Sequence, residues 1–382
     1  MIRTYPVKGK YGGIGRRPIS PYNLPNYVTN VGKSSTEVNQ LLTARPSFFH
    51  HLHPPTIPAR EARFRYTFGL GGISVYLFVI LLFTGALETI YYIPTAEGAN
   101  QSLQEITFLV PYGRLVRSLH FWSAQALVIT NLLHMLRVVF TGAYKSPRRF
   151  NWLLGVSLLV LVLLFNFSGY ALRWDTGIAW ALLVGTNLLK TIPLIGPELY
   201  AFLVGGAEIG SQTVTRFYSW HIYLLPLAAI FLIAWHLFRV RRDGGISRST
   251  SKVGGQPKIH RNELVWREVL ALIVASILLL LLSTFLSPRL GSQLDYQNLA
   301  PDAKAPWFFL WIQELLRLGS PFLMGVLIPG MILVFLAILP YAIDRRAAGV
   351  GDWFNRQGRV AQGIVLALVV FIVGFSLRGW FR

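Results

Sequence analysis

Long uninterrupted runs of apolar residues constrain this chain more than any other feature of its sequence. Several runs reach about 20 residues, the length that a helix needs to cross a bilayer core roughly 30 Å thick. Of the 382 residues, 53% are hydrophobic and 14% are charged, which is far below the roughly 25% of charged residues in a soluble domain. Because backbone groups inside a bilayer must be hydrogen-bonded within the protein, we expect these runs to be helices.

Seven such spans predict an all-α, multi-pass membrane protein. Their expected bounds are 66–93, 115–140, 152–172, 217–240, 264–286, 321–342 and 360–377. A glycine-rich polar stretch at 244–256 separates the first four spans from the last three. We therefore expect an arm at 1–65, a four-helix domain at 66–243, a linker at 244–263 and a three-helix domain at 264–382.

The arm at 1–65 contains ten Lys or Arg residues and no apolar core of the kind that a signal peptide has. We expect a surface helix near 34–43 within it. The arm either contacts lipid or a partner, or it is a solvated tail that its charge keeps on the negative side of the membrane. The composition favours the solvated tail.

The formal net charge of +20 invites a nucleic-acid partner, but the distribution of the basic residues argues against one. They are concentrated in the arm and in alternate loops, the pattern that the positive-inside rule gives. The connections after the second, fourth and sixth spans carry Arg148, Arg241 and Arg346 among others. We expect these connections and the N-terminus to lie on the negative, cytoplasmic side.

Cysteine is absent, so disulfides and thiolate-bound metals or cofactors are excluded on this chain. Four of the eight histidines lie inside the predicted spans: His120 and His134 on the second, His221 and His236 on the fourth. At a rise of 1.5 Å per residue, each pair is separated by roughly 21–22 Å along its helix. If the two helices face each other, His120 meets His221 near the positive side and His134 meets His236 near the negative side.

Two imidazoles at each level are typical of haem iron ligation, whereas a tetrahedral zinc site needs more ligands. A single histidine in a span could equally hydrogen-bond a neighbouring helix. Four histidines matched in level on two helices favour two stacked bis-histidine haem sites, because ionisable groups in lipid are costly.

Glycines and arginines accompany these histidines. Gly71 and Gly85 on the first span, and Gly155 and Gly169 on the third, are fourteen residues apart, which matches the vertical spacing of the histidine pairs. A porphyrin edge between helices needs residues without side chains, although ordinary packing of small residues is the alternative.

Arg117 lies one turn before His120, and Arg137 lies one turn after His134. Both are suited to binding the anionic haem propionates. Arg137 could also be a basic anchor on the negative side of the membrane.

Several stretches of the chain resemble cytochrome b of the quinol–cytochrome c oxidoreductases. They are Arg117-Ser-Leu-His120, His134-Met-Leu-Arg137-Val, Gly169-Tyr-Ala-Leu-Arg-Trp174-Asp175 and Thr215-Arg216-Phe-Tyr-Ser-Trp-His221. The closer similarity is to the photosynthetic branch of these cytochrome bc complexes, in which a four-helix cytochrome b and a three-helix subunit IV are separate chains. The histidine spacings and the stretches Tyr91-Tyr-Ile-Pro-Thr and Ile192-Pro-Leu-Ile-Gly fit that branch. The resemblance runs from about residue 66 to 382, is most specific over 66–243, and makes this chain look like both halves fused.

This resemblance implies a mechanism. A quinol is oxidised near the positive side, where one electron passes to a Rieske iron–sulfur protein and on to a c-type cytochrome or a similar acceptor. The other electron crosses two non-covalent b-type haems to a quinone pocket on the negative side, coupled to proton translocation. The implied iron ligands are the four histidines. The further implied contacts are Arg117 and Arg216 at the positive-side haem, and Arg137, Lys145, Arg148 and Arg241 at the negative-side haem and pocket.

The resemblance also implies surroundings. The chain is expected to lie in lipid, as a homodimer within a multi-subunit complex, in a bacterial inner membrane or a thylakoid-like membrane.

Two departures from the family pattern affect the expected chemistry. Gly69 stands where the photosynthetic branch attaches an extra haem to a cysteine, so no such haem is expected. The quinol-oxidation loop of the family reads Pro-Glu-Trp-Tyr, whereas this chain has Pro306, Trp307 and Phe308 without the glutamate.

A proton acceptor for the quinol must therefore lie elsewhere. Glu314, which follows the loop by about two turns, is the preferred candidate, ahead of Asp175 and the loop residue Asp302. Glu314 could equally pair with Arg317, three residues on.

Two alternative functions remain at this point. One is a two-haem anchor subunit of a dehydrogenase or hydrogenase, which has a different histidine pattern and no quinol loop of this kind. The other is a proton-coupled transporter with buried histidines, which the lack of inverted repeats argues against.

Overall fold

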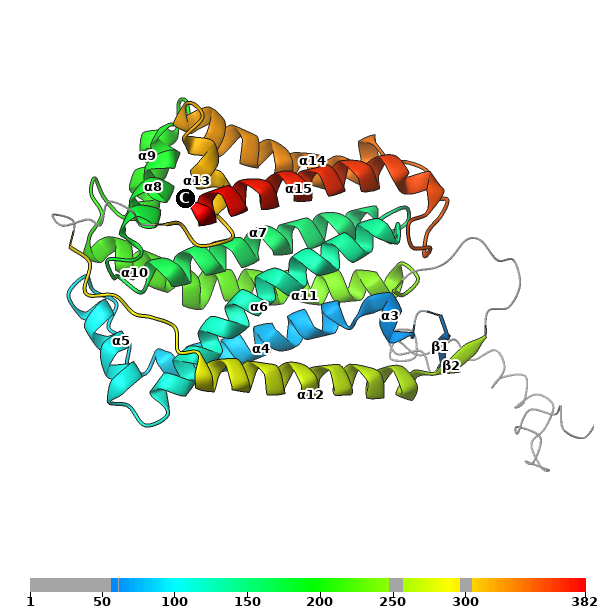
Figure 1. The fold of residues 1–382 in the computed structure, drawn as a ribbon, viewed down its shortest axis with the longest axis horizontal. Helices are drawn as coiled ribbons and strands as arrows, with labels where there is room; N and C mark the ends of the chain where they lie inside the picture. The colour runs from blue at the N-terminus through cyan, green and yellow to red at the C-terminus, as the bar shows by residue number, and fades with distance from the viewer. Residues whose placement is uncertain (1–55, 61, 247–256, 296–303) are drawn as a thin grey trace, which may run out of the picture. The chain divides into compact units, whose positions relative to one another are not determined.

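The computed structural model describes residues 56–60, 62–246, 257–295 and 304–382, which belong to one compact unit, Leu52–Arg382. It confirms the all-α membrane fold, because seven of its helices are long and apolar enough to cross a bilayer (Figure 1). These spans are Leu70–Glu88, Gly113–Phe140, Arg149–Ala171, Ser211–Arg242, Arg261–Phe285, Phe322–Ala342 and Arg356–Phe381. The surface helix expected near 34–43 lies outside the described residues, as does Asp302.

The first four spans carry the four histidines and the four glycines that the sequence analysis singled out. They are α4 (Leu70–Glu88), α6 (Gly113–Phe140), α7 (Arg149–Ala171) and a composite fourth span. The fourth span consists of α10 (Ser211–Ser219), the π-helical segment η2 (Trp220–Leu224) and α11 (Leu225–Arg242). Helix α6 packs against α4 and α7, and α11 packs against α7. Each histidine-bearing span therefore has a glycine-bearing span beside it.

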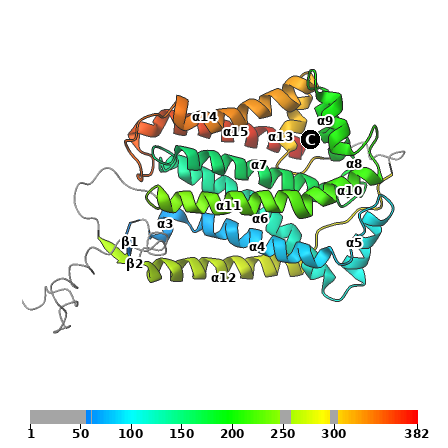
Figure 2. The same cartoon turned by 180° about the vertical axis from the view of Figure 1, so that it is seen from behind.

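The last three spans flank the first four. Helix α12 (Arg261–Phe285) packs against α4 and α6. The sixth span, η3 (Phe322–Leu327) followed by α14 (Ile328–Ala342), packs against α7, and α15 (Arg359–Phe381) packs against α6. Both views place α12 on one side of the first four spans and α14 with α15 on the other (Figures 1 and 2). The last three spans thus flank the first four on two sides.

Short elements gather at the two ends of the spans (Figure 1). At one end are α5 (Gly98–Phe108), α8 (Ala179–Lys190), α9 (Gly196–Val204) and α13 (Leu310–Leu316). At the other end are α3 (Phe64–Thr67), the short turn η4 (Arg356–Gly358) and two strands, β1 (Thr56–Pro58) and β2 (Lys258–His260). The strands pair antiparallel, with Ile57 opposite Ile259. Part of the expected linker at 244–263 is therefore a strand and the first turn of α12.

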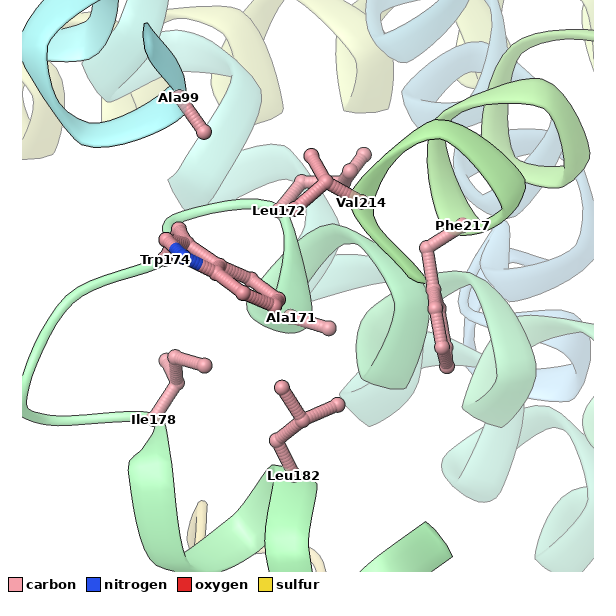
Figure 3. Packing of buried hydrophobic residues seen from close by; sticks show 8 residues of the cluster. All are labelled: Ala99, Ala171, Leu172, Trp174, Ile178, Leu182, Val214 and Phe217. Carbon is pink, nitrogen blue, oxygen red and sulfur yellow. The ribbon is translucent and has the colours of Figure 1, made fainter. Parts of the chain in front are cut away.

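A buried cluster fixes the end that carries α5 and α8. Trp174 lies between Ala99 of α5 on one side and, on the other, Ile178, which immediately precedes α8, and Leu182 of α8 (Figure 3). Trp174 and Ile178 are almost fully buried. This packing anchors the turn that follows α7, where one of the candidate acids, Asp175, is found.

Candidate functional site

The structure brings His120 and His221 together at one level. Their ring centroids are 6.3 Å apart, and the ring planes are inclined by 58°. An iron held about 2 Å from one nitrogen of each imidazole would place the two centroids roughly 6 Å apart. The spacing therefore fits a single iron between the two rings.

His134 and His236 line a cavity of about 430 Å³ at the second level. Apolar side chains such as Leu127, Val162 and Phe165 form most of its wall. A mostly apolar cavity with a few convergent polar groups is typical of a cofactor site. In the part of the chain that the structure describes, no group of three or more His, Cys, Asp or Glu could hold a metal ion. Two histidines at each level fit haem, whose iron can be held by two imidazoles from the protein.

Each of the four histidines lies against one of the four glycines. A Cβ atom added at Gly85 would lie 3.1 Å from Cε1 of His120, and one added at Gly169 would lie 2.8 Å from Cε1 of His221. At the other level, the corresponding distances are 3.3 Å from Gly71 to His134 and 3.7 Å from Gly155 to His236. The glycines therefore make room for the imidazole rings themselves. The sequence had suggested instead that they make room for the edge of a porphyrin.

Hydroxyl groups next to two of these glycines contact the histidines at the first level. The Thr84 hydroxyl lies 2.9 Å from Nδ1 of His120, and the Ser168 hydroxyl lies 2.9 Å from Nδ1 of His221. Contacts from neighbouring helices of this kind fix the orientation of a histidine ligand.

A π-helical turn explains how the two unequal histidine spacings stay matched. His120 and His134 are fourteen residues apart, but His221 and His236 are fifteen apart. In a regular helix the fifteenth residue would overshoot the starting face by about 60°. His221 lies within η2, where the π-turn absorbs one extra residue. Pro226 lies just after η2. Its ring and its missing N–H disfavour regular α-helical geometry in the turn before it, which is η2.

The loop after α12 approaches the first histidine level. The indole Nε1 of Trp307 donates to Oε1 of Gln125 on α6 at 2.8 Å. Phe308 is buried in a cluster with Leu127 and other apolar residues, and the Phe309 ring meets Phe167, the residue before Ser168. Aromatic residues of the loop thus pack against α6 and α7.

Comparisons with known proteins identify the family of this chain. A family model described as Cytochrome b/b6/petB matches residues 59–244. Cytochrome b6 of Heliomicrobium gestii is 40% identical over 177 residues, covering 46% of this chain and 83% of that protein. The chain belongs to the cytochrome b family.

Two further similarities extend the comparison. A menaquinol:cytochrome c reductase cytochrome b subunit of Geobacillus thermodenitrificans is 37% identical over 180 residues, covering 47% of this chain and 80% of that protein. A solved structure of a hyperthermophilic respiratory Complex III superposes with a TM-score of 0.75 at 20% identity, over 90% of this chain and 91% of that chain. This last likeness shows that the fold extends beyond the family match. The family resemblance and the assignment to an oxidoreductase complex are confirmed, and the family implies b-type haem.

The arginines of this cytochrome b divide between the two levels. Arg137, Arg148 and Arg241 line the cavity with His134 and His236. Arg117 is buried at the other level, where its guanidinium donates to the Pro288 carbonyl at 2.6 Å. The Arg216 guanidinium donates a hydrogen bond to the backbone carbonyl of Phe202 and lies over the aromatic ring of the same residue.

Lys145 is placed differently from the expectation. It does not line the cavity. Its Nζ atom forms a fully buried ion pair with Asp344 at 3.0 Å, and the Tyr144 hydroxyl donates to the same carboxylate at 2.6 Å. Burial and this hydrogen bond raise the pKa of Tyr144 above its ordinary value. Tyr144, Lys145 and Asp344 therefore join the loop after α6 to the segment that follows α14.

Glu314 forms the ion pair that the sequence offered as its alternative role. Its buried carboxylate lies 3.0 Å from Arg317, 3.3 Å from Arg378 and 3.7 Å from Arg382. Three guanidinium groups therefore surround this carboxylate. The cluster also holds α13 against α15.

Asp175 is fully buried and hydrogen-bonded on both oxygens. Oδ1 accepts from the Ile178 backbone at 3.1 Å, while Oδ2 accepts from Gly291 at 2.9 Å and pairs with Arg173. The Trp174 carbonyl also accepts a hydrogen bond from the Leu294 backbone. These bonds fasten the turn after α7 to the segment after α12.

Sequence reasoning missed several polar residues near the sites. Glu268 on α12 lines the cavity together with Arg241. Glu88, at the end of α4, has a buried oxygen atom that is hydrogen-bonded to no other residue in the described part of the chain. The signal that could have found both is an acid inside an apolar span. The signal for the hydroxyls was the repeated pattern Thr84-Gly85 and Ser168-Gly169.

Proposed function

We propose that this cytochrome b holds two non-covalent haems and carries electrons from a quinol-oxidising site on the positive side to a quinone-reducing site on the negative side. The observation that carries the proposal is the pairing of His120 with His221 and of His134 with His236 at two levels. When bound, haem supplies reversible one-electron chemistry at its iron.

The four histidines would hold the two haem irons, and the glycines that face them would make room for the imidazoles. At the negative side, Arg137 and Arg148 line the cavity and would meet the anionic propionates. Arg117 would have this role at the positive side, where it is buried one turn before His120.

The quinol pocket would lie where the aromatic loop meets α6 and α7. Trp307 is held by Gln125, while Phe308 and Phe309 pack inward, so these rings would exclude water from the pocket. The engagement of Asp175 and Glu314 in hydrogen bonds and ion pairs favours structural roles for both.

The quinone-reducing pocket would occupy the part of the cavity lined by Arg241, Gly245 and Glu268. The Arg241 guanidinium would donate a hydrogen bond to a quinone oxygen. A carboxyl oxygen of Glu268 would hold a proton for the same acceptor.

The setting follows from this role. The chain would work as a homodimer in a lipid bilayer, with a Rieske iron–sulfur protein and a c-type cytochrome, coupled to proton translocation. The loops that contain Arg148 and Arg346 would face the negative side, because their basic residues disfavour translocation.

Rapid mixing of the purified complex with a quinol tests the proposal. The native chain should show reduction of two b-type absorption signals, with steady turnover. In a His236→Leu variant, quinol should still reduce the remaining signal once, but turnover should stop. Turnover that survives this substitution, or quinol that reduces neither signal of the native chain, would contradict the proposed route.

A further inference from the structure

Basic side chains gather at the end of the molecule that carries α13 (Figure 1). Arg317 follows α13, whereas Arg378 and Arg382 lie at the end of α15. The side chains of all three are about half exposed. The proposed orientation puts this end on the positive side, opposite the basic loops. The positive-inside rule therefore does not account for these three arginines.

One buried acid holds the three guanidinium groups together. The Glu314 carboxylate lies within 4 Å of each of them, and the shortest distance is 3.0 Å, to Arg317. Gly379 makes the approach of α15 possible, because a Cβ atom added there would lie 3.0 Å from Cγ of Glu314. The arginines are thus fixed at their inner side, while their outer side stays exposed.

The cluster has more positive than negative side chains. Lys304 is exposed, and its Nζ atom donates to the Trp380 carbonyl at 2.7 Å, which brings a fourth cation to the end of α15. Among the described residues, Glu314 is the acid that forms ion pairs with the three arginines. One carboxylate does not balance four cations, so the cluster would attract an anion.

The surface of α15 beside this cluster is apolar and exposed. Val373, Leu377 and Trp380 are each about half exposed, and they follow one another at helical spacing. An added Cβ atom at Gly374, one turn before Arg378, would meet no atom within 4 Å, so the helix surface is open there. Tryptophan at the end of a span is typical of the interface between membrane and water. A ligand that fits this surface is therefore apolar along the helix and anionic at its end.

We propose that Arg317, Arg378 and Arg382 bind the phosphate of an anionic phospholipid, whose acyl chains lie along the exposed face of α15. Arg317 and Arg378 approach Glu314 through Nε, so their terminal nitrogens can donate to phosphate oxygens. Paired hydrogen bonds of this kind are strong, because both groups are charged. The inference rests on the proposed function for its orientation, which puts the lipid in the positive-side leaflet.

Native mass spectrometry of the purified complex tests the proposal, with equal amounts of phosphatidylglycerol and phosphatidylcholine added in detergent micelles. The native complex should retain phosphatidylglycerol in preference. Arg378→Gln should lower this preference about fivefold, which corresponds to about 1 kcal/mol for one basic residue near an anionic membrane surface. Adding Arg382→Gln should lower the preference further.

Two further variants separate a lipid site from general attraction and from a merely structural cluster. Arg359 is an exposed arginine at the other end of α15, so Arg359→Gln should leave the preference unchanged. Glu314→Gln loosens the same contact between α13 and α15 as Arg378→Gln does, but it removes the acid that competes for the guanidinium groups. Retention of phosphatidylglycerol should therefore rise in Glu314→Gln and fall in Arg378→Gln.

Three results would overturn the proposal. Equal retention of the two lipids by the native complex would do so, and would favour an acidic segment of a partner subunit as the occupant. The same fall in Arg359→Gln as in Arg378→Gln, or a fall in Glu314→Gln, would also do so. Quinol turnover of the native complex reports separately on the proposed function, because the three arginines have no part in the proposed electron route.

Discussion

Each of the four histidines within the spans faces a glycine on a neighbouring span, and the four contacts are not equally tight. The added Cβ would lie 2.8 Å from the ring at Gly169 and 3.7 Å from the ring at Gly155. The first distance is shorter than real Cβ contacts, whereas the second is ordinary van der Waals contact. The need for glycine is therefore greatest beside His221.

We predict that Gly169→Ala weakens haem binding at the positive-side level, while Gly155→Ala has little effect at the other level. Inserting an atom into a packed site typically costs about 1–3 kcal/mol, which corresponds to a loss of roughly 5- to 150-fold in haem affinity. Haem retained per chain after dilution in detergent measures this effect. Equal loss in the two variants would show that the contact distances do not decide it.

At the scale of elements, the π-turn in the fourth span decides whether His221 faces His120. We predict that Pro226→Ala allows this span to relax towards a regular helix and turns His221 away from its partner. Haem content should fall towards one per chain, with the negative-side signal retained. Deleting Tyr223 in the same variant should restore two haems, because fourteen residues of regular helix then separate His221 from His236.

Pro329 provides the control for this experiment. It follows the π-segment η3 in the sixth span, where no histidine lies. Pro329→Ala should leave both haem signals unchanged. If Pro226→Ala behaves in the same way, the π-turn does not set the register of the histidines.

The spans, the pairing of the histidines and the accompanying glycines could be predicted, because helical period and bilayer thickness relate sequence spacing directly to position. The sequence could not place Lys145, since its partner Asp344 comes from an element distant along the chain. For Glu314 it offered the nearby Arg317, but not Arg378, which lies on the last span. Hydrophobic patterns indicate which residues enter the bilayer, but they do not indicate which loops meet at its surface. Pro226 was a sequence signal for the π-turn. The sequence argument missed it because it assumed a regular helix with a fixed number of residues per turn.

At the scale of the whole molecule, the buried pair of Lys145 and Asp344 connects the first four spans to the last three. We predict that Lys145→Met destabilises the fold by about 3–5 kcal/mol, because it leaves an unpaired carboxylate in a buried site. Thermal unfolding of the purified chain should show this loss. The double variant Lys145→Met with Asp344→Asn should recover part of it, since a neutral amide still accepts the Tyr144 hydrogen bond. A double variant less stable than Lys145→Met alone would contradict this account of the pair.

The central claim, that two pairs of histidines hold two haems, is tested most directly by counting haem. Extraction of the purified chain with acidified acetone, followed by pyridine haemochrome quantitation, should give two b-type haems per chain, none of them covalently attached. His120→Leu and His221→Leu should each lower the count to one and remove the same absorption signal. His134→Leu should remove the other signal. One haem or none in the native chain, or loss of different signals in the His120 and His221 variants, would contradict the account.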